Sequence, residues 1–268
     1  MIATIKSEWR KNRFRPAFLV GSGLMAAITA LFYSVSWYQA THAGSADGPV
    51  SLLSLYPSTF VYNAMGAGFP LGAAMAIVLG AILTGSDYSW GTVKTVLTQG
   101  PGRLTAWTGR VIVFMGWMGI LTFVMFVIGA VYSAVIAATQ NQAVVWPAAT
   151  EIAKGLGTMW LLLAAFGSVG LALGVLIKQS AAALGVGLVY LLAVEILAVR
   201  FIDGLNSGAY KWIGDLFIGQ NATALTQNFA GRAATPSISA EQAVLVLMAY
   251  IVGLFIVAGA LQRVRDIT

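Results

Sequence analysis

The sequence predicts an all-α integral membrane protein with six transmembrane helices. Of its 268 residues, 59% are hydrophobic and only 9% are charged, whereas about a quarter of a soluble domain is charged. The apolar residues form long runs, which favours helices over the alternating strands of an outer-membrane barrel. No long polar stretch remains between these runs, so we expect a single transmembrane domain over residues 1–268 and no separate soluble domain.

Each apolar run is long enough to span the bilayer core, which is about 30 Å thick and takes about 20 helical residues. The first run is too long for the apolar core of a secretory signal, which has about 7–15 residues, and is expected to be a retained helix. The predicted spans are about 17–38, 59–83, 110–138, 152–177, 181–201 and 241–262.

Residues 1–15 precede the first span and hold five basic residues and one acidic residue. Trp9 and Phe14 add apolar surface to this segment. Such a composition predicts a short interfacial helix on an anionic membrane leaflet.

Segment 86–100 is predicted to be a second surface helix, between spans two and three. Ser86 is a suitable helix cap, and Asp87 in the first turn suits the helix dipole. Trp90 and Val93 fall on an apolar side that would face the lipid and the bundle, and the opposite side, with Asp87, would face the cytosol. The sequence Gly100-Pro101-Gly102 ends the helix.

Residues 206–235, before the last span, are too apolar for a free loop and too short to cross the membrane. Trp212 and Phe217 are among their large apolar side chains. We expect short helices that lie at, or dip into, the outer leaflet.

An even number of spans, six, puts the two termini on the same side of the membrane. If that side is cytoplasmic, it carries eleven of the 15 lysines and arginines. An excess of Lys and Arg in short loops marks the cytoplasmic side, so both termini and segment 86–110 are predicted to be cytoplasmic. The eleven residues are Lys6, Arg10, Lys11, Arg13, Arg15, Lys94, Arg103, Arg110, Lys178, Arg263 and Arg265.

The sequence argues against catalysis by this chain alone. It has no G-x-x-x-x-G-K-[ST] phosphate loop, and its one histidine, His42, lies in a predicted outer loop. No cluster of His, Asp and Glu has the spacing of metal ligands, and there is no cysteine. The net charge of +6 is interpreted as the basic cytoplasmic edge of a membrane protein, so no nucleic-acid partner is predicted.

Glu195 is the main charged residue inside a predicted span, where a charge costs about 2.5–3.5 kcal/mol near mid-bilayer. One interpretation is a polar point in a conduit or a proton relay. The other, which we favour, places Glu195 near the outer interface, compensated by Arg200 or by the following loop. Glu151 and Lys154, three residues apart, are expected to form a local pair at the start of the fourth span.

Two small-residue motifs, Gly68-x-x-x-Gly72 and Gly170-x-x-x-Gly174, allow close helix contacts. Packing within the chain is favoured over a subunit interface for both motifs.

The pattern Asp87-Tyr88, Gly91-Thr92-Val93 and Pro101-x-Arg103 resembles the loop between spans two and three of ABC type-2 transporter permeases. That loop often reads E-Y-x-x-G-T, then P-x-R or P-x-x-R, then a basic residue at the start of the next span. Here Asp87 stands in place of the glutamate, and Arg110 is the basic residue. The resemblance implies that segment 86–100 is a coupling helix that contacts the ATPase through Asp87, Tyr88, Gly91, Thr92, Lys94, Pro101 and Arg103.

By this resemblance the chain is a permease subunit of an ATP-driven exporter in a bacterial cytoplasmic membrane. It would pair with a second permease, the same or a related chain, and with two cytosolic ATPase subunits that hold ATP and Mg²⁺, so no cofactor is expected on this chain. Residues 206–235 would be re-entrant helices that close the exit. The sparsely charged spans point to an amphipathic or lipophilic cargo, such as a drug, antibiotic, peptide or lipid-like compound, moved by alternating access. The alternatives are an ion-coupled secondary carrier, which would show internal repeats, and a non-transporting anchor or sensor subunit.

Overall fold

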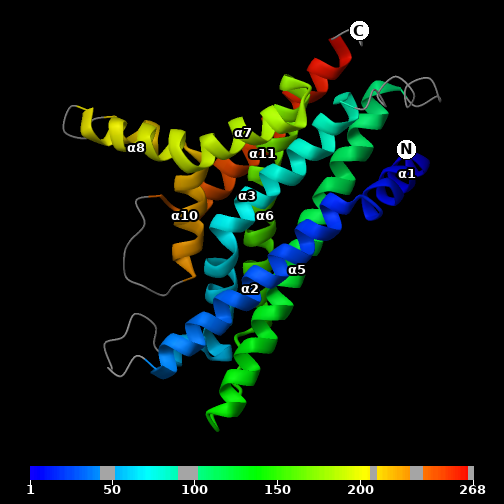
Figure 1. Cartoon of the computed structure of the whole chain (residues 1–268). Coiled ribbons are helices and arrows are strands. Elements are labelled where there is room, and N and C mark those ends of the chain that lie inside the picture. The colour runs from blue at the N-terminus through cyan, green and yellow to red at the C-terminus, as the bar shows by residue number, and fades with distance from the viewer. Residues whose placement is uncertain (43–51, 90–101, 206–209, 230–237, 265–268) are drawn as a thin grey trace.

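The computed structural model describes residues 1–42, 52–89, 102–205, 210–229 and 238–264, and these ranges contain helices and no strand (Figure 1). The α-helices are α1 (Ile2–Arg13), α2 (Pro16–His42), α3 (Phe60–Ser89), α5 (Arg103–Thr139), α6 (Ala149–Ile177), α7 (Ser180–Val189), α8 (Glu195–Gly204), α9 (Lys211–Gly214), α10 (Ile218–Asn228) and α11 (Ala240–Val264). Short 3-10 turns at Leu52–Leu55 and Pro57–Thr59 lead into α3, and a π-helical segment, Tyr190–Val194, joins α7 to α8.

Six helical stretches in the described ranges are long and apolar enough to cross a membrane. They match the six predicted spans in number and order, so the all-α fold with six candidate membrane spans is confirmed for the described residues. Two helices extend beyond the spans predicted for them. Helix α3 continues to Ser89 instead of ending near residue 83, and α5 starts at Arg103 instead of residue 110. Polar side chains of these added turns bind other parts of the protein: Asp87 pairs with Lys11 of α1, Thr84 donates to the Leu171 carbonyl of α6, and Arg103 donates to the Arg263 carbonyl of α11.

The closest packing in the protein is between α3 and α6, which lie side by side through glycines. A Cβ atom at Gly170 of α6 would clash with the carbonyl oxygen of Ile77 on α3, and one at Gly80 of α3 would clash with that of Gly167. A Cβ atom at Gly68 would likewise meet Met125 and Met159 of the same chain. The interpretation of the small-residue motifs as packing within the chain is confirmed.

One end of the bundle carries α1, the end of α3, the start of α5 and the end of α11 (Figure 1). Gly109 of α5 lies against Thr4 of α1, and the Arg103 guanidinium donates to the Arg263 carbonyl at 3.2 Å. We call this the α1 end. The other end, which carries the starts of α3, α6 and α11, is called the far end.

Helix α1 lies across the bundle and packs mainly on α5. Trp9 of α1 stacks on Trp117 of α5 with ring centroids 5.3 Å apart, and Phe18 of α2 meets the same ring. The prediction of a helix at the N-terminus is confirmed, and its position at a membrane surface remains a prediction.

The fifth span is divided in two by the π-helical segment. Helix α7 packs on α3 and α6, whereas α8 turns away from the bundle and packs mainly on α9 (Figure 1). A π-helical turn carries an extra residue, which changes the direction and phase of the following helix. This turn brings the start of α8 to the start of α10.

Candidate functional site: an ion cluster at the α1 end and a cavity at the far end

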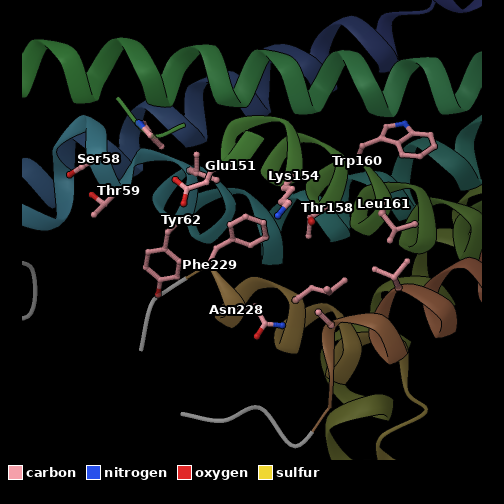
Figure 2. Close-up of a pocket in the computed structure, with 16 residues that line it drawn as sticks. Ser58, Thr59, Tyr62, Glu151, Lys154, Thr158, Trp160, Leu161, Asn228 and Phe229 are labelled. Atoms are coloured by element: carbon pink, nitrogen blue, oxygen red, sulfur yellow. The ribbon is translucent and has the colours of Figure 1, made fainter. Parts of the chain in front are cut away.

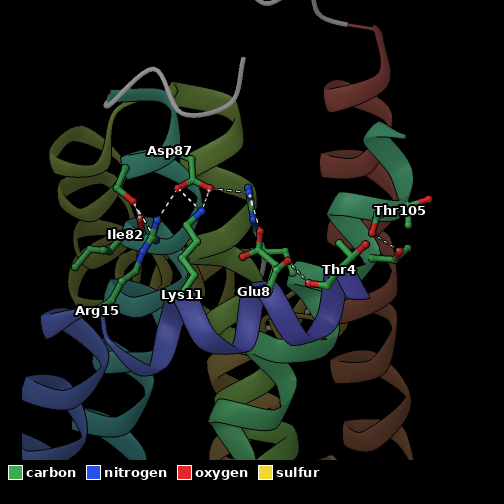
Figure 3. A network of polar contacts seen from close by, with 11 residues as sticks. Thr4, Glu8, Lys11, Arg15, Ile82, Asp87 and Thr105 are labelled. Atoms are coloured by element: carbon green, nitrogen blue, oxygen red, sulfur yellow. Dashed lines mark hydrogen bonds and ion pairs between the residues drawn. The ribbon is translucent and has the colours of Figure 1, made fainter. Parts of the chain in front are cut away.

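The Asp87 carboxylate, in the last turn of α3, is bound by three cations from other parts of the chain (Figure 3). Lys11 Nζ of α1 donates to both carboxylate oxygens, at 2.9 and 2.8 Å. Arg15, between α1 and α2, places Nη2 2.6 Å from Oδ1. Arg110 of α5 places Nη2 2.6 Å from Oδ2. One carboxylate therefore joins α1, the start of α2, α3 and α5.

This ion cluster is enclosed by protein. The side chain of Asp87 is 1% exposed, and those of Arg15 and Arg110 are 9% and 8% exposed. Glu8 of α1, also buried, lies 3.7 Å from Arg110. Three cations and two carboxylates leave one net positive charge, and Asp87 is the carboxylate that contacts all three cations, whereas Glu8 contacts Arg110.

Burial lowers the pKa of the Lys11 ammonium below its usual range, and the Asp87 carboxylate beside it only partly offsets this effect. Two polar atoms of the cluster, Oε2 of Glu8 and Nε of Arg110, lack a hydrogen-bond partner in the described structure, as do both amide atoms of the buried Asn12 of α1. Such unpaired groups destabilise a buried site. The cluster is therefore held by close charge pairs, but its hydrogen-bonding groups are not all satisfied in the described structure.

The structure corrects the predicted start of segment 86–100. Ser86 does not cap a new helix: its hydroxyl donates to the Ile82 carbonyl, one turn earlier in α3, and accepts from Arg15. Asp87 does not face outward, because the three cations enclose it. Residues 86–89 continue α3, since serine bonded to the preceding turn leaves a helix unbroken and buried cations compensate the acidic side chain.

The other residues predicted to contact an ATPase are placed only in part. Tyr88 lies at the end of α3 with Lys178 Nζ 5.9 Å from its ring centroid. Arg103 begins α5 at the α1 end, beside the end of α11. Gly91, Thr92, Lys94 and Pro101 lie outside the described residues, so the helix predicted over 86–100 stays a prediction beyond residue 89.

Sequence reasoning did not identify Lys11 and Arg15 as partners of Asp87, because they were interpreted only as contacts to an anionic leaflet. One signal could have found them. An acidic residue at the end of an apolar span needs a nearby cation, and segment 1–15 is the richest source of cations in the chain.

Glu195, at the start of α8, is 4% exposed and lies against the start of α10. Its carboxylate accepts the backbone N–H groups of Gly219 and Gln220, and the Tyr190 hydroxyl donates to it. The N–H groups of a first helical turn have no partner within the helix and favour a negative charge. Of the two interpretations, compensation by the segment that follows the fifth span therefore agrees with the structure, with Gly219 and Gln220 of α10 in place of Arg200 as the partners of this carboxylate.

The far end contains a cavity of about 1030 Å³ between the starts of α3, α6 and α11 and the end of α10 (Figure 2). Its volume is at the upper end of the range for small-molecule sites, about 300–1,000 Å³. Aromatic, aliphatic, hydroxyl and charged side chains line it, among them Tyr62, Glu151, Lys154, Trp160, Leu161 and Phe229. Within the described ranges, no three His, Asp or Glu side chains gather as a metal site requires.

Comparison with known proteins identifies a family but no named relative. No curated protein matches the chain. The family model described as "Protein of unknown function (DUF2705)" matches residues 21–268, which is most of the chain and includes all six candidate spans except the first turn of α2. The protein therefore belongs to the DUF2705 family.

Proposed function

We propose that this protein is the permease subunit of an ATP-driven exporter of amphipathic or lipophilic compounds. The chain supplies six apolar spans and no phosphate loop. A membrane domain of this kind needs a motor from another polypeptide, and two cytosolic ATPase subunits fit that role. A second permease, the same or a related chain, would complete the pathway.

The ion cluster at Asp87 is the observation that most supports this proposal. It lies at the end of α3, next to the segment whose sequence resembles the coupling region of ABC type-2 permeases. It joins that point to α1, to Arg15 before α2 and to α5 through Arg110. A displacement of segment 90–101 by an ATPase would therefore act on several spans together instead of on α3 alone.

Two further features bear on the proposed orientation in the membrane. The α1 end carries most of the lysines and arginines and is expected to face the cytosol. Helices α9 and α10, between the fifth and sixth spans, would then form the proposed re-entrant structure on the exit side. Glu195 would hold α10 in place there through its N-terminal N–H groups.

The decisive experiment reconstitutes the chain with a candidate ATPase subunit, in lipid nanodiscs for hydrolysis and in proteoliposomes for transport. Replacing Gly91 by Val and Thr92 by Val should leave the ATPase bound but reduce substrate-stimulated hydrolysis and transport at least about tenfold, a loss of about 1.4 kcal/mol in coupling. The control is Thr41→Val, which removes an exposed hydroxyl near the C-terminus of α2.

Each outcome discriminates. Full transport by the Gly91 and Thr92 variant with the ATPase bound would rule out coupling through this segment. Transport driven by an ion gradient without any ATPase would indicate a secondary carrier. ATP hydrolysis that never responds to a transported compound would indicate an anchor or sensor subunit.

A further inference from the structure

The cavity at the far end is separated from the ion cluster by the length of the bundle, and coupling to an ATPase does not explain it. Four helices contribute to its wall: α3, α6, α10 and α11 (Figure 2). All four belong to this one chain, so the cavity exists without a second permease. It is large enough for a drug-sized molecule or for the polar part and upper chain of a lipid.

Two opposite charges lie side by side on the cavity wall. Glu151 and Lys154 are three residues apart in the first two turns of α6, so their side chains project from neighbouring positions on one helical face. The sequence predicted that they pair with each other. In the described residues neither takes part in an ion pair within 4 Å. Both charges are therefore available to a ligand.

The polarity of this face changes along α6. Glu151 and Lys154 are followed on the same side by Thr158 and then by Leu161, all of which line the cavity. Ten residues of helix separate Glu151 from Leu161, which corresponds to ~15 Å along the axis. Near Leu161 the wall is completed by the buried apolar side chain of Leu225 of α10. The cavity thus has a charged opening and an apolar interior.

Aromatic rings flank the passage from the charged to the apolar part. The Trp160 indole N–H donates to the Met115 carbonyl at 3.0 Å, which fixes that ring on the side of α5. Tyr62 of α3 and Phe229 at the end of α10 also line the cavity, and Figure 2 shows the Phe229 ring turned toward Glu151 and Lys154 of α6. Ring faces attract cations such as ammonium groups, so these residues favour the positive part of a ligand.

We propose that this cavity binds a zwitterionic amphiphile. The cationic group lies by Glu151 and the aromatic rings, the anionic group accepts hydrogen bonds from the Lys154 ammonium, and the alkyl chain extends toward Leu161 and Leu225. A purely anionic ligand is repelled by Glu151, a purely cationic one by Lys154, and a nonionic one leaves both charges unpaired. The inference concerns binding and holds whether or not the chain transports anything.

The test uses a photoreactive dodecylphosphocholine with a diazirine in its alkyl chain, applied to the full-length protein in nonionic detergent. Mass spectrometry of the labelled peptides reports the site. We expect labelling of the peptides that contain Leu161 and Leu225. Unlabelled dodecylphosphocholine should compete better than dodecyl phosphate, dodecyltrimethylammonium and dodecyl maltoside, which carry the same chain with one charge or none.

Two single variants test the charges, and two others are matched controls. Lys154→Met and Glu151→Gln should each weaken dodecylphosphocholine competition about tenfold, the effect of one hydrogen bond to a charged group. Lys211→Met and Glu241→Gln remove exposed charges that do not line the cavity and should leave competition unchanged. All four positions are exposed, so folding is not at risk.

Two results overturn the proposal. If dodecyl phosphate competes as well as dodecylphosphocholine and Glu151→Gln has no effect, the site binds anions only. If the four compounds compete equally well and neither Lys154→Met nor Glu151→Gln changes the competition, the alkyl chain alone determines binding of the probe. The two charges would then play no part in ligand selection.

Discussion

The Asp87 carboxylate at the end of α3 lies 2.6 Å from the Arg15 guanidinium, a residue 72 positions earlier in the chain. Both side chains are almost completely buried. Lys11 and Arg110 bind the same carboxylate, so three basic side chains share one acidic group. Substitutions at the α1 end should therefore change stability according to how many of these charge pairs they remove.

Replacing Asp87 by asparagine should be the most damaging single change in the cluster. It removes the anion that Lys11, Arg15 and Arg110 share. Removing one partner of a buried pair costs about 3–5 kcal/mol, so we expect a clear fall in melting temperature, measured by the loss of the monodisperse peak after heating in detergent. Asp203→Asn, at an exposed position of α8, is the control. Equal melting temperatures for the two variants would contradict the cluster's role.

Replacing a single cation should cost less than replacing Asp87, because two cations still bind the carboxylate. Arg110→Met should be worse than Lys11→Met. Arg110 also contacts Glu8 and is 8% exposed, whereas the Lys11 side chain is 27% exposed and burial lowers the pKa of its ammonium. The expected order of melting temperatures is wild type, Lys11→Met, Arg110→Met, Asp87→Asn, from highest to lowest. An inverted order for the two cation variants would show that Lys11 is the principal partner.

Gly170→Ala should force α3 and α6 apart, because the added methyl group would clash with the Ile77 carbonyl oxygen. Overpacking of this kind costs about 1–3 kcal/mol, and it should appear as a lower melting temperature. Gly185→Ala in α7 is the matched control, since a Cβ there meets nothing within 4 Å. Alanine is the better helix former by about 1 kcal/mol, so this control should be at least as stable as the wild type.

Glu195→Gln should loosen the start of α10 without disturbing the rest of the bundle. The glutamine keeps an acceptor oxygen for the Gly219 N–H group but loses the charge that interacts with the helix dipole, an effect of up to about 2 kcal/mol when partly buried. Hydrogen–deuterium exchange should become faster in Ile218–Asn228 and stay unchanged in α6. Glu241→Gln, an exposed acid in the first turn of α11, should change neither. Uniform acceleration across the protein would point instead to a general loss of stability.

The predicted orientation is open to a direct test because the chain has no cysteine. Single cysteines at Ser7 of α1 and at Gln142, after α5, lie at exposed positions of opposite ends of the bundle. A membrane-impermeant maleimide should label Gln142→Cys in right-side-out vesicles and Ser7→Cys in inverted ones. The reverse pattern would place the basic α1 end outside and contradict the charge-based orientation.

Much of the membrane architecture could be predicted from local sequence. The six spans follow from runs of about 20 apolar residues, since the bilayer requires that length of any helix. The helix of segment 1–15 was likewise predictable. The ends of α3 and α5 were not, because the helical state of residues 84–89 and 103–109 depends on partners from α1, α6 and α11.

The sequence by itself determined the class of this protein, the number of its spans and the side on which its positive charge gathers, because these depend on composition and on the length of each apolar run. Only the tertiary structure decided which charges are paired. Asp87 binds residues 72 and 76 positions away, Glu195 binds the start of α10, and Glu151 and Lys154 remain separate. Such pairs depend on how helices pack against one another, and the residue pattern of one helix does not determine which other helix packs against it.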